Sequence, residues 1–196
     1  LEGGAFVCGA AVQWLRDELG LIKTAAEIES LAASVPDSGG VEFVPALTGL
    51  GAPYWDPEAR GLLCGLTRGT GRGHIARATL DAMALQNADI LGAMEQDVDA
   101  RMKPLRVDGG AAANNLLMQL QADYLGRKII RPTVIETTVA GACFLAGLGV
   151  GLWSSTAEIS KIWGIERDFT VALPPKKRAQ RVAQWHHAVR RAQMSV

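Results

Sequence analysis

The sequence predicts a layered α/β fold, and two observations carry that prediction. Short apolar segments that end near glycine or proline alternate along the chain with longer segments in which apolar residues recur every three or four positions. The first pattern is typical of strands and the second of amphipathic helices. The composition agrees, because 48% of the 196 residues are hydrophobic and 20% are charged, which suits a chain that buries a core.

The chain opens with two predicted helices. Residues 5–19 form the first, because apolar side chains such as Phe6, Ala10 and Trp14 recur at four-residue spacing. Residues 24–33 form the second, in which Thr24 is a suitable N-cap and is followed by a glutamate three residues later, as in a capping box.

The remaining elements alternate between strands and helices. Strands are predicted where short apolar runs meet proline or glycine, at residues 41–44, 61–66, 105–107 and 128–130. Helices are predicted where apolar residues keep a period near 3.6, at residues 74–100, 114–125, 138–150 and from the "LPPKK" segment to the end of the chain.

Charge and cysteine usage limit the classes of partner. Lysine plus arginine equals aspartate plus glutamate at 20 each, which argues against bulk attraction to nucleic acid or to an anionic membrane. Cys8, Cys64 and Cys143 are odd in number and far apart, as expected for reduced thiols in the cytoplasm. No signal peptide and no 18-residue apolar run is found, and the start at Leu1 instead of methionine predicts a piece of a longer protein.

The stretch "LRVDGGAAANN" (Leu105–Asn115) is the main candidate site. Gly109 and Gly110 between a strand and a helix let the backbone approach a ligand, and the free N–H groups of the helix that follows favour a phosphate. Asn114 can cap that helix or contact an adenine. The alternative is a tight turn with an asparagine cap and no ligand.

Three other features are interpreted as structural. The glycines of Arg68–His74 lack the ending of a P-loop and the spacing of a dinucleotide turn, so a flexible surface connection is predicted. His186 and His187 are neighbours in a helix and would not chelate one metal together, so no metal site is predicted. The basic run Lys176–Arg181 is expected on a solvated helix face.

Several segments together resemble the FGGY family of carbohydrate kinases. "TGLGAPYWDPEARG" (Thr48–Gly61) resembles a loop of the members that phosphorylate glycerol, and "GLLCGL" with "HIARATLD" resembles the family's C-terminal signature. "RVDGGAAANNLLMQLQADYLG" resembles the family's motif on the adenine side of the nucleotide. "LEGGAFVCGAAVQWLRDELGLI" and "AQWHHAVRRA" extend the similarity over nearly the whole chain, whereas "TTVAGACFLAG" departs from the family's usual "ALGAAxLAG".

The resemblance implies an actin-like/ribonuclease H-like ATPase domain, the second domain of such a kinase. Residues 1–196 would be the C-terminal nucleotide-binding domain, without the N-terminal substrate domain. By motif match, Gly9, Gln13, Gly110 and Asn114 would bind ATP or ADP. Asp108 keeps two interpretations, either ordering the turn or holding a magnesium-bound water.

The implied reaction is the phosphorylation of glycerol by ATP, with Mg²⁺, to give glycerol 3-phosphate and ADP. In such kinases an aspartate takes the proton of the substrate hydroxyl, and the resemblance places that aspartate outside this chain, so the chain alone would be inactive. Alternatives are a kinase for another polyol or sugar and a non-catalytic nucleotide-binding module; a dinucleotide-binding oxidoreductase lacks its glycine motif here. Loss of a covering domain predicts an apolar patch or self-association, and a homo-oligomer stays open.

Overall fold

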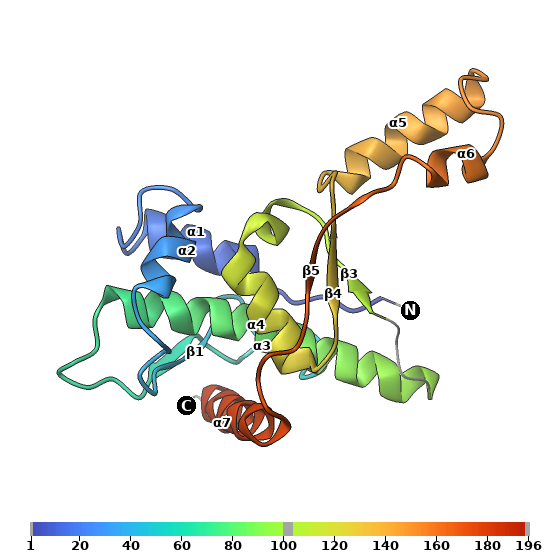
Figure 1. Cartoon of the computed structure of the whole chain (residues 1–196). Helices are drawn as coiled ribbons and strands as arrows, with labels where there is room; N and C mark the ends of the chain where they lie inside the picture. The colour runs from blue at the N-terminus through green and yellow to red at the C-terminus, as the bar shows by residue number, and fades with distance from the viewer. Residues whose placement is uncertain (1, 100–103, 195–196) are drawn as a thin grey trace.

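A computed structural model describes residues 2–99 and 104–194, and it confirms an α/β fold (Figure 1). The helices are α1 (Gly9–Asp17), α2 (Glu27–Ala33), α3 (Arg72–Val98), α4 (Asn115–Leu125), α5 (Thr137–Gly149), α6 (Thr156–Ser160) and α7 (Pro175–Gln193), with a 3-10 turn at Gly110–Ala113. The strands are β1 (Glu42–Val44), β2 (Leu62–Cys64), β3 (Leu105–Arg106), β4 (Ile129–Pro132) and β5 (Ile165–Phe169).

Two small sheets organise the strands. β1 and β2 pair antiparallel, with Phe43 opposite Leu63. The second sheet has the order β3-β4-β5, in which β3 and β4 are parallel and β4 and β5 antiparallel. The parallel pair is joined by α4, which is the crossover expected for a β-α-β unit.

The predicted elements are present with shifted ends, and two were not predicted. Glu27 accepts hydrogen bonds from the Thr24 hydroxyl (3.3 Å) and the Lys23 N–H (2.9 Å), so the expected pair interacts, although α2 begins only at Glu27. β4 includes Pro132 instead of stopping before it. α6 and β5 were missed, and β5 gives a weak signal because only Phe169 of its residues is buried.

The core of the body lies where α3 packs against its neighbours. Leu80, Met83 and Leu85 of α3 are almost fully buried, together with Leu117 of α4 and Trp185 of α7. α3 runs through the body in Figure 1, with α4 crossing it and α7 lying on another side. α3 is therefore covered on most sides, which explains why its apolar residues are not confined to one stripe.

A carboxylate on α3, whose side chain is 8% exposed, joins two segments that are distant in the sequence. Asp89 Oδ2 accepts hydrogen bonds from the Tyr54 hydroxyl and from Trp185 Nε1, both at 2.6 Å. Asp89 Oδ1 lies 2.7 Å from His186 Nε2. The loop at residues 48–61 is thereby tied to α3 and α7.

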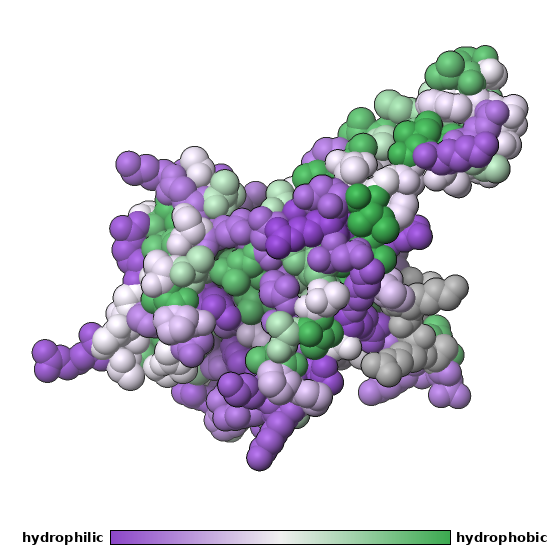
Figure 2. Space-filling view, viewed as in Figure 1, coloured by the Kyte–Doolittle hydropathy of each residue, from purple (hydrophilic) through white to green (hydrophobic). Residues whose placement is uncertain are grey.

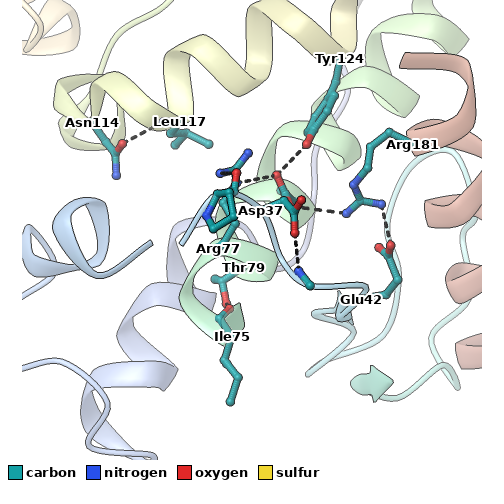
Figure 3. Close-up of polar contacts among 12 residues, drawn as sticks. Asp37, Glu42, Ile75, Arg77, Thr79, Asn114, Leu117, Tyr124 and Arg181 are labelled. Carbon is teal, nitrogen blue, oxygen red and sulfur yellow. Dashed lines mark hydrogen bonds and ion pairs between the residues drawn. The ribbon is translucent and has the colours of Figure 1, made fainter. Parts of the chain in front are cut away.

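A second carboxylate, Asp81, lies at the centre of a network of charged side chains. It accepts a 2.7 Å hydrogen bond from the Tyr124 hydroxyl and pairs with Arg77 at 3.3 Å and with Arg181 at 3.6 Å. Arg181 also binds Glu42 at 2.6 Å, and Figure 3 shows Tyr124, Arg181 and Glu42 of this network. The expectation of a solvated basic run is wrong for Arg181, whose side chain is only 15% exposed.

Residues 133–164, named the arm here, carry α5 and α6 away from the rest of the molecule (Figure 1). In Figure 2 the arm shows hydrophobic residues among neutral and hydrophilic ones, and its large exposed apolar side chains include Val139, Leu145 and Leu152. The arm therefore presents exposed apolar side chains, and the expectation that a covering domain leaves such a patch stays a prediction. Within the described residues, no helix combines the length and the apolar character that a membrane crossing requires.

Substitution of Asp89 by alanine should destabilise the fold by about 3 kcal/mol, because the buried Trp185 N–H and the Tyr54 hydroxyl lose their acceptor. Urea unfolding measures this free energy. Asp97→Ala is the matched control, since Asp97 is an exposed acid on the same helix, and it should change the free energy by less than about 0.5 kcal/mol. Equal effects of the two substitutions would contradict a structural role for the Asp89 contacts.

The stability should also fall at alkaline pH because of Tyr124. Burial, together with the nearby charge of Asp81, raises the pKa of Tyr124 above its ordinary value of 10.0. As the pH rises above that value, the unfolded chain releases this proton while the folded chain keeps it, so the free energy of unfolding decreases. In Tyr124→Phe this decrease between pH 9 and pH 11 should be smaller by up to about 1.4 kcal/mol per pH unit. Parallel pH profiles of the two proteins in urea unfolding would refute this assignment.

Candidate functional site

The predicted glycine-asparagine turn lies between β3 and α4. Gly109 has a φ of +77°, a left-handed conformation that glycine adopts without strain. The 3-10 turn at Gly110–Ala113 follows, and α4 then begins with Asn114 as its N-cap. Asn114 Oδ1 accepts a 2.8 Å hydrogen bond from the Leu117 N–H, as drawn in Figure 3, so the predicted cap is confirmed.

The four residues predicted to bind nucleotide come together in one pocket. Gly9 and Gln13 of α1 lie on its wall, and Gly110 and Asn114 of the turn lie there as well. The pocket has a volume of about 370 Å³. Its other lining residues come from the α1–α4 region and are mostly apolar: Val12, Ala25, Ala26, Ile28, Glu29, Leu80, Met83, Ala111, Ala113 and Leu117.

Neither packing within the protein nor backbone conformation requires glycine at positions 9 and 110 of this pocket. A Cβ atom added at Gly9 or at Gly110 would meet no atom of the protein within 4 Å. Neither residue has the positive φ that favours glycine. Glycine at these positions therefore leaves space beside the backbone. That space is useful only to a ligand that approaches the backbone there.

The N-terminus of α4 is already occupied by groups of the protein. Glu29 Oε1, from α2, accepts hydrogen bonds from the N–H groups of Asn115 (3.1 Å) and Leu116 (3.3 Å). Asn114 takes the next N–H, of Leu117. The hypothesis that free N–H groups of this helix favour a phosphate is therefore wrong for α4, because its donors are used and a carboxylate stands beside them.

Arg131 of β4 braces the turn from its other side. Its side chain is 8% exposed and donates hydrogen bonds to the carbonyl oxygens of Ala112 (2.7 Å) and Ala113 (3.2 Å). It also donates to Asn115 Oδ1 at 2.9 Å and forms a 2.6 Å ion pair with Glu166 of β5. The hydrogen bond from Arg131 lowers the pKa of Glu166 below its ordinary value.

The Arg131 brace was not found from the sequence. The available signal was an arginine inside a short strand, "IIRP", where the neighbouring residues are apolar. A charged side chain in such a position needs several partners within the fold. The partners lie in other segments, so the strand pattern alone does not identify them.

The remaining candidate residues lie outside this pocket. The hydroxyl of Thr137 donates a hydrogen bond to Asp108 Oδ2, so this carboxylate links the turn to the start of α5. The loop at residues 48–61 does not line the pocket, and its Tyr54 is held by Asp89. Across residues 2–99 and 104–194, no group of three or more His, Cys, Asp or Glu side chains is arranged to hold a metal ion.

Comparison with known proteins places the chain in a family. Residues 1–150 match the FGGY family of carbohydrate kinases, C-terminal domain. The glycerol kinase of Bdellovibrio bacteriovorus is 60% identical over 97% of this chain and 39% of its own length. The glycerol kinase of Aromatoleum aromaticum is 58% identical over 98% of this chain and 39% of its own length. The chain thus spans about two fifths of these relatives.

Solved structures support the same assignment. The crystal structure of Plasmodium falciparum glycerol kinase with ADP matches with a TM-score of 0.86 and 34% identity, covering 96% of this chain and 37% of that one. A gluconate kinase from Lactobacillus acidophilus matches with a TM-score of 0.77 and 24% identity, covering 98% of this chain and 40% of that one. The expected actin-like ATPase fold is confirmed. The match over residues 1–150 shows that the chain belongs to the FGGY family of carbohydrate kinases.

Proposed function

We propose that this chain is the ATP-binding half of a glycerol kinase, which transfers a phosphoryl group from ATP to glycerol and releases ADP. The observation that carries the proposal is the meeting of Gly9, Gln13, Gly110 and Asn114 in one pocket. These residues belong to two segments far apart in the sequence, and the family motifs predict that both segments contact the nucleotide. The ADP-containing Plasmodium falciparum kinase supports a nucleotide as the ligand.

The pocket has the chemistry that the nucleoside end of ATP requires. Side chains of Val12, Ile28, Leu80 and Met83 give apolar walls suited to an adenine ring. Gln13 and Asn114 supply amide groups that can donate and accept hydrogen bonds. The open backbone at Gly9 and Gly110 leaves room for close approach of the ligand.

The phosphates of the nucleotide should extend away from the start of α4. Glu29 holds a carboxylate against the Asn115 and Leu116 N–H groups, and a phosphate placed there would meet a like charge. The turn therefore serves the nucleoside end of the ligand, and the reacting end lies toward residues supplied by another part of the enzyme.

The catalytic base and the glycerol-binding groups are expected in that other part. None of the acids in the described ranges is assigned as the base by motif. Mg²⁺ is expected with ATP in this family, but the described side chains do not by themselves form a magnesium site, and Asp108 is engaged by Thr137. The 196-residue chain alone should therefore bind nucleotide without phosphorylating glycerol.

A cytoplasmic location also stays a prediction.

Glycerol is the preferred substrate among the alternatives. Two glycerol kinases share 58–60% identity with this chain, whereas the gluconate kinase shares 24%. A kinase for another polyol or sugar is therefore less well supported. A non-catalytic nucleotide-binding module is the other alternative. When the chain is joined to the rest of such a kinase, a glycerol kinase domain should support phosphorylation of glycerol, whereas a non-catalytic module should not.

Titration of the chain with ADP tests the proposed site. Binding near the millimolar range, roughly −4 kcal/mol, is expected for a half-site. NMR amide shifts should cluster at Gly9, Gln13, Gly110 and Asn114, because these residues line the pocket. Shifts spread elsewhere, or their absence at several millimolar ADP, would argue against this pocket as a nucleotide site in the chain.

Gly110→Ala tests whether the ligand approaches the backbone at Gly110. The added methyl group meets no protein atom, so the fold should keep its stability, while the ligand loses space and its affinity should fall by about tenfold. Gly92→Ala is the matched control, since its Cβ would also meet nothing within 4 Å and Gly92 lies outside the pocket. Equal ADP affinities in the two variants would contradict close approach of the ligand at Gly110.

Arg131→Lys tests the brace as a positioning device. Lysine keeps the charge but has a single side-chain nitrogen, which cannot bind the Ala112 carbonyl, Asn115 Oδ1 and Glu166 at the same time, so ADP affinity should fall by about fivefold to tenfold. The turn amides of the free chain should shift as well, which a purely global loss of stability would not produce selectively. Arg106→Lys, at an exposed position on β3, is the control and should leave the ADP titration unchanged.

A further inference from the structure

Glu29 of α2 places a carboxylate in the wall of the candidate nucleotide pocket. Its Oε1 accepts hydrogen bonds from the N–H groups of Asn115 (3.1 Å) and Leu116 (3.3 Å). These two bonds to the end of a helix fix the direction in which the carboxylate faces. Within residues 2–99 and 104–194, Oε2 of Glu29 has no hydrogen-bond or ion-pair partner, so it can accept a hydrogen bond from a ligand.

Asn114 presents a hydrogen-bond donor at the same end of α4. Its Oδ1 accepts the hydrogen bond from the Leu117 N–H, and Figure 3 shows its amide nitrogen turned away from that bond. No residue of the described ranges accepts a hydrogen bond from this nitrogen. Glu29 and Asn114 together bind the consecutive N–H groups of residues 115–117, so both side chains lie at one helical turn. The pocket therefore combines an acceptor and a donor at that turn.

Purine bases differ in the groups that they show to such a pair. Adenine carries an amino group at C6, which donates a hydrogen bond, on the same edge as N7, which accepts one. Guanine and hypoxanthine carry an oxygen at C6 and therefore show two acceptors, O6 and N7, on that edge. A donor such as the Asn114 amide nitrogen can meet N7 in all three bases, so it does not distinguish them. An acceptor next to it separates the 6-amino base from the 6-oxo bases.

We propose that Glu29 selects the base of the nucleotide, because its carboxylate accepts a hydrogen bond from a 6-amino group and repels a 6-oxo group. This inference rests on the proposed function, since it takes a purine nucleotide as the ligand of the pocket. A carboxylate that has no proton to donate cannot pair with O6, so a 6-oxo base leaves two acceptors facing each other. Glu29 thereby gives the pocket a preference for adenine nucleotides over those of guanine and hypoxanthine.

Gln13 is the third polar side chain of the pocket wall, and it suits this role less well. Its amide contains both a donor and an acceptor, so rotation of the side chain lets it pair with either kind of base. Gln13 is also exposed, and no hydrogen bond to a described residue fixes its side chain. Glu29 is partly buried and held by two hydrogen bonds, which is the rigidity that discrimination between ligands requires.

The ribose is the other part of a nucleotide that a carboxylate could bind, since its hydroxyl groups donate hydrogen bonds. Two observations favour the base. Glu29 shares its helix end with Asn114, whose free amide nitrogen complements a ring nitrogen of a purine. The wall around them is apolar and suits the faces of a ring, with Val12, Ile28, Leu80, Met83 and Leu117.

Titration of the chain with ADP, GDP and inosine diphosphate (IDP) tests the inference, with NMR amide shifts as the measurement. ADP should bind at least about tenfold more tightly than GDP or IDP, as expected for a hydrogen bond to a charged group. In Glu29→Gln the new amide offers a donor for O6 and an oxygen that can still bind the N–H groups of Asn115 and Leu116. The preference for ADP over IDP should therefore fall to about twofold.

Glu27→Gln is the matched control. Glu27 is an acid of the same helix that does not line the pocket, so this variant should keep the preference of the unmodified chain for ADP. The amide shifts of Asn115 and Leu116 in the free chain report whether the cap of α4 survives in Glu29→Gln. If Glu29 has only a structural role, Glu29→Gln changes the affinities for ADP and IDP by the same factor. An unchanged ratio of the two affinities therefore overturns the inference.

A chimera repeats the comparison under turnover. This chain replaces the matched region of the Bdellovibrio bacteriovorus glycerol kinase, and kcat/KM is measured with glycerol and either ATP or inosine triphosphate (ITP). The ratio of the two values should be at least about ten, and it should fall to about two in Glu29→Gln. If the isolated chain binds too weakly for titration, the chimera decides: a ratio near one in the unmodified chimera overturns the inference.

Titration with 2′-deoxy-ADP tests the ribose as the partner of Glu29. The inference predicts that Glu29→Gln leaves the ratio of the affinities for ADP and 2′-deoxy-ADP unchanged. A preference for ADP over 2′-deoxy-ADP that Glu29→Gln removes, while the preference over IDP stays, overturns the inference and assigns Glu29 to the ribose.

Activity of the chimera separates this inference from the proposed function. Glycerol phosphorylation that proceeds equally well with ATP and ITP would sustain the function and overturn the selection by Glu29. An adenine preference of the chain that depends on Glu29, without glycerol phosphorylation by the chimera, would sustain the selection and overturn the function. Absence of nucleotide binding in both the chain and the chimera would overturn both.

Discussion

The capping of α4 is the constraint on which the pocket depends. The first N–H groups of a helix cannot find partners within that helix, and leaving them buried and unpaired costs about 1–3 kcal/mol each. Here Glu29 supplies a carboxylate from α2 for the N–H groups of Asn115 and Leu116, and Asn114 serves the next one. This arrangement draws α2 toward the turn. The pocket is the space that remains between α1, α2, α3 and that turn.

Buried acids on α3 fix the other side of the body in a similar way. Asp81 gathers groups from α3, α4 and α7, and Asp89 gathers groups from α7 and the loop at residues 48–61. A buried carboxylate without partners is strongly unfavourable, so each contact limits how these segments can shift. The net charge of the chain does not predict these carboxylate networks, because it does not show which charged side chains are buried together.

The sequence predicted those parts of the candidate pocket that follow from local chemistry or from a family motif. The Asn114 cap followed from the residue type at the start of an apolar helical pattern, and Gly9, Gln13 and Gly110 followed from resemblance to a family. Glu29 was not identified, because the N–H groups that it binds belong to a helix distant in the sequence. Local periodicity reports the face of an element but gives no indication of which element will lie against it.

The same limit explains the two elements that were missed and the basic run that was misjudged. β5 exposes most of its residues and is stabilised by pairing with β4 and by the Arg131–Glu166 ion pair, neither of which leaves a periodic apolar pattern. Arg181 resembles its solvated neighbours in sequence and differs from them only because Glu42 and Asp81 lie next to it in space.

α5 presents the opposite case, in which the sequence indicates burial and the chain alone does not supply it. A helix without a polar face is typical of the interior of a larger fold. Its uncharged sequence lies within the region matched to the FGGY family, and relatives with 58–60% identity align over nearly all of this chain, so the arm is an ordinary part of the family's domain. The hydrogen bonds at the base of the arm connect it to the turn between β3 and α4, through Gly109 with Ile135 and Asp108 with Thr137.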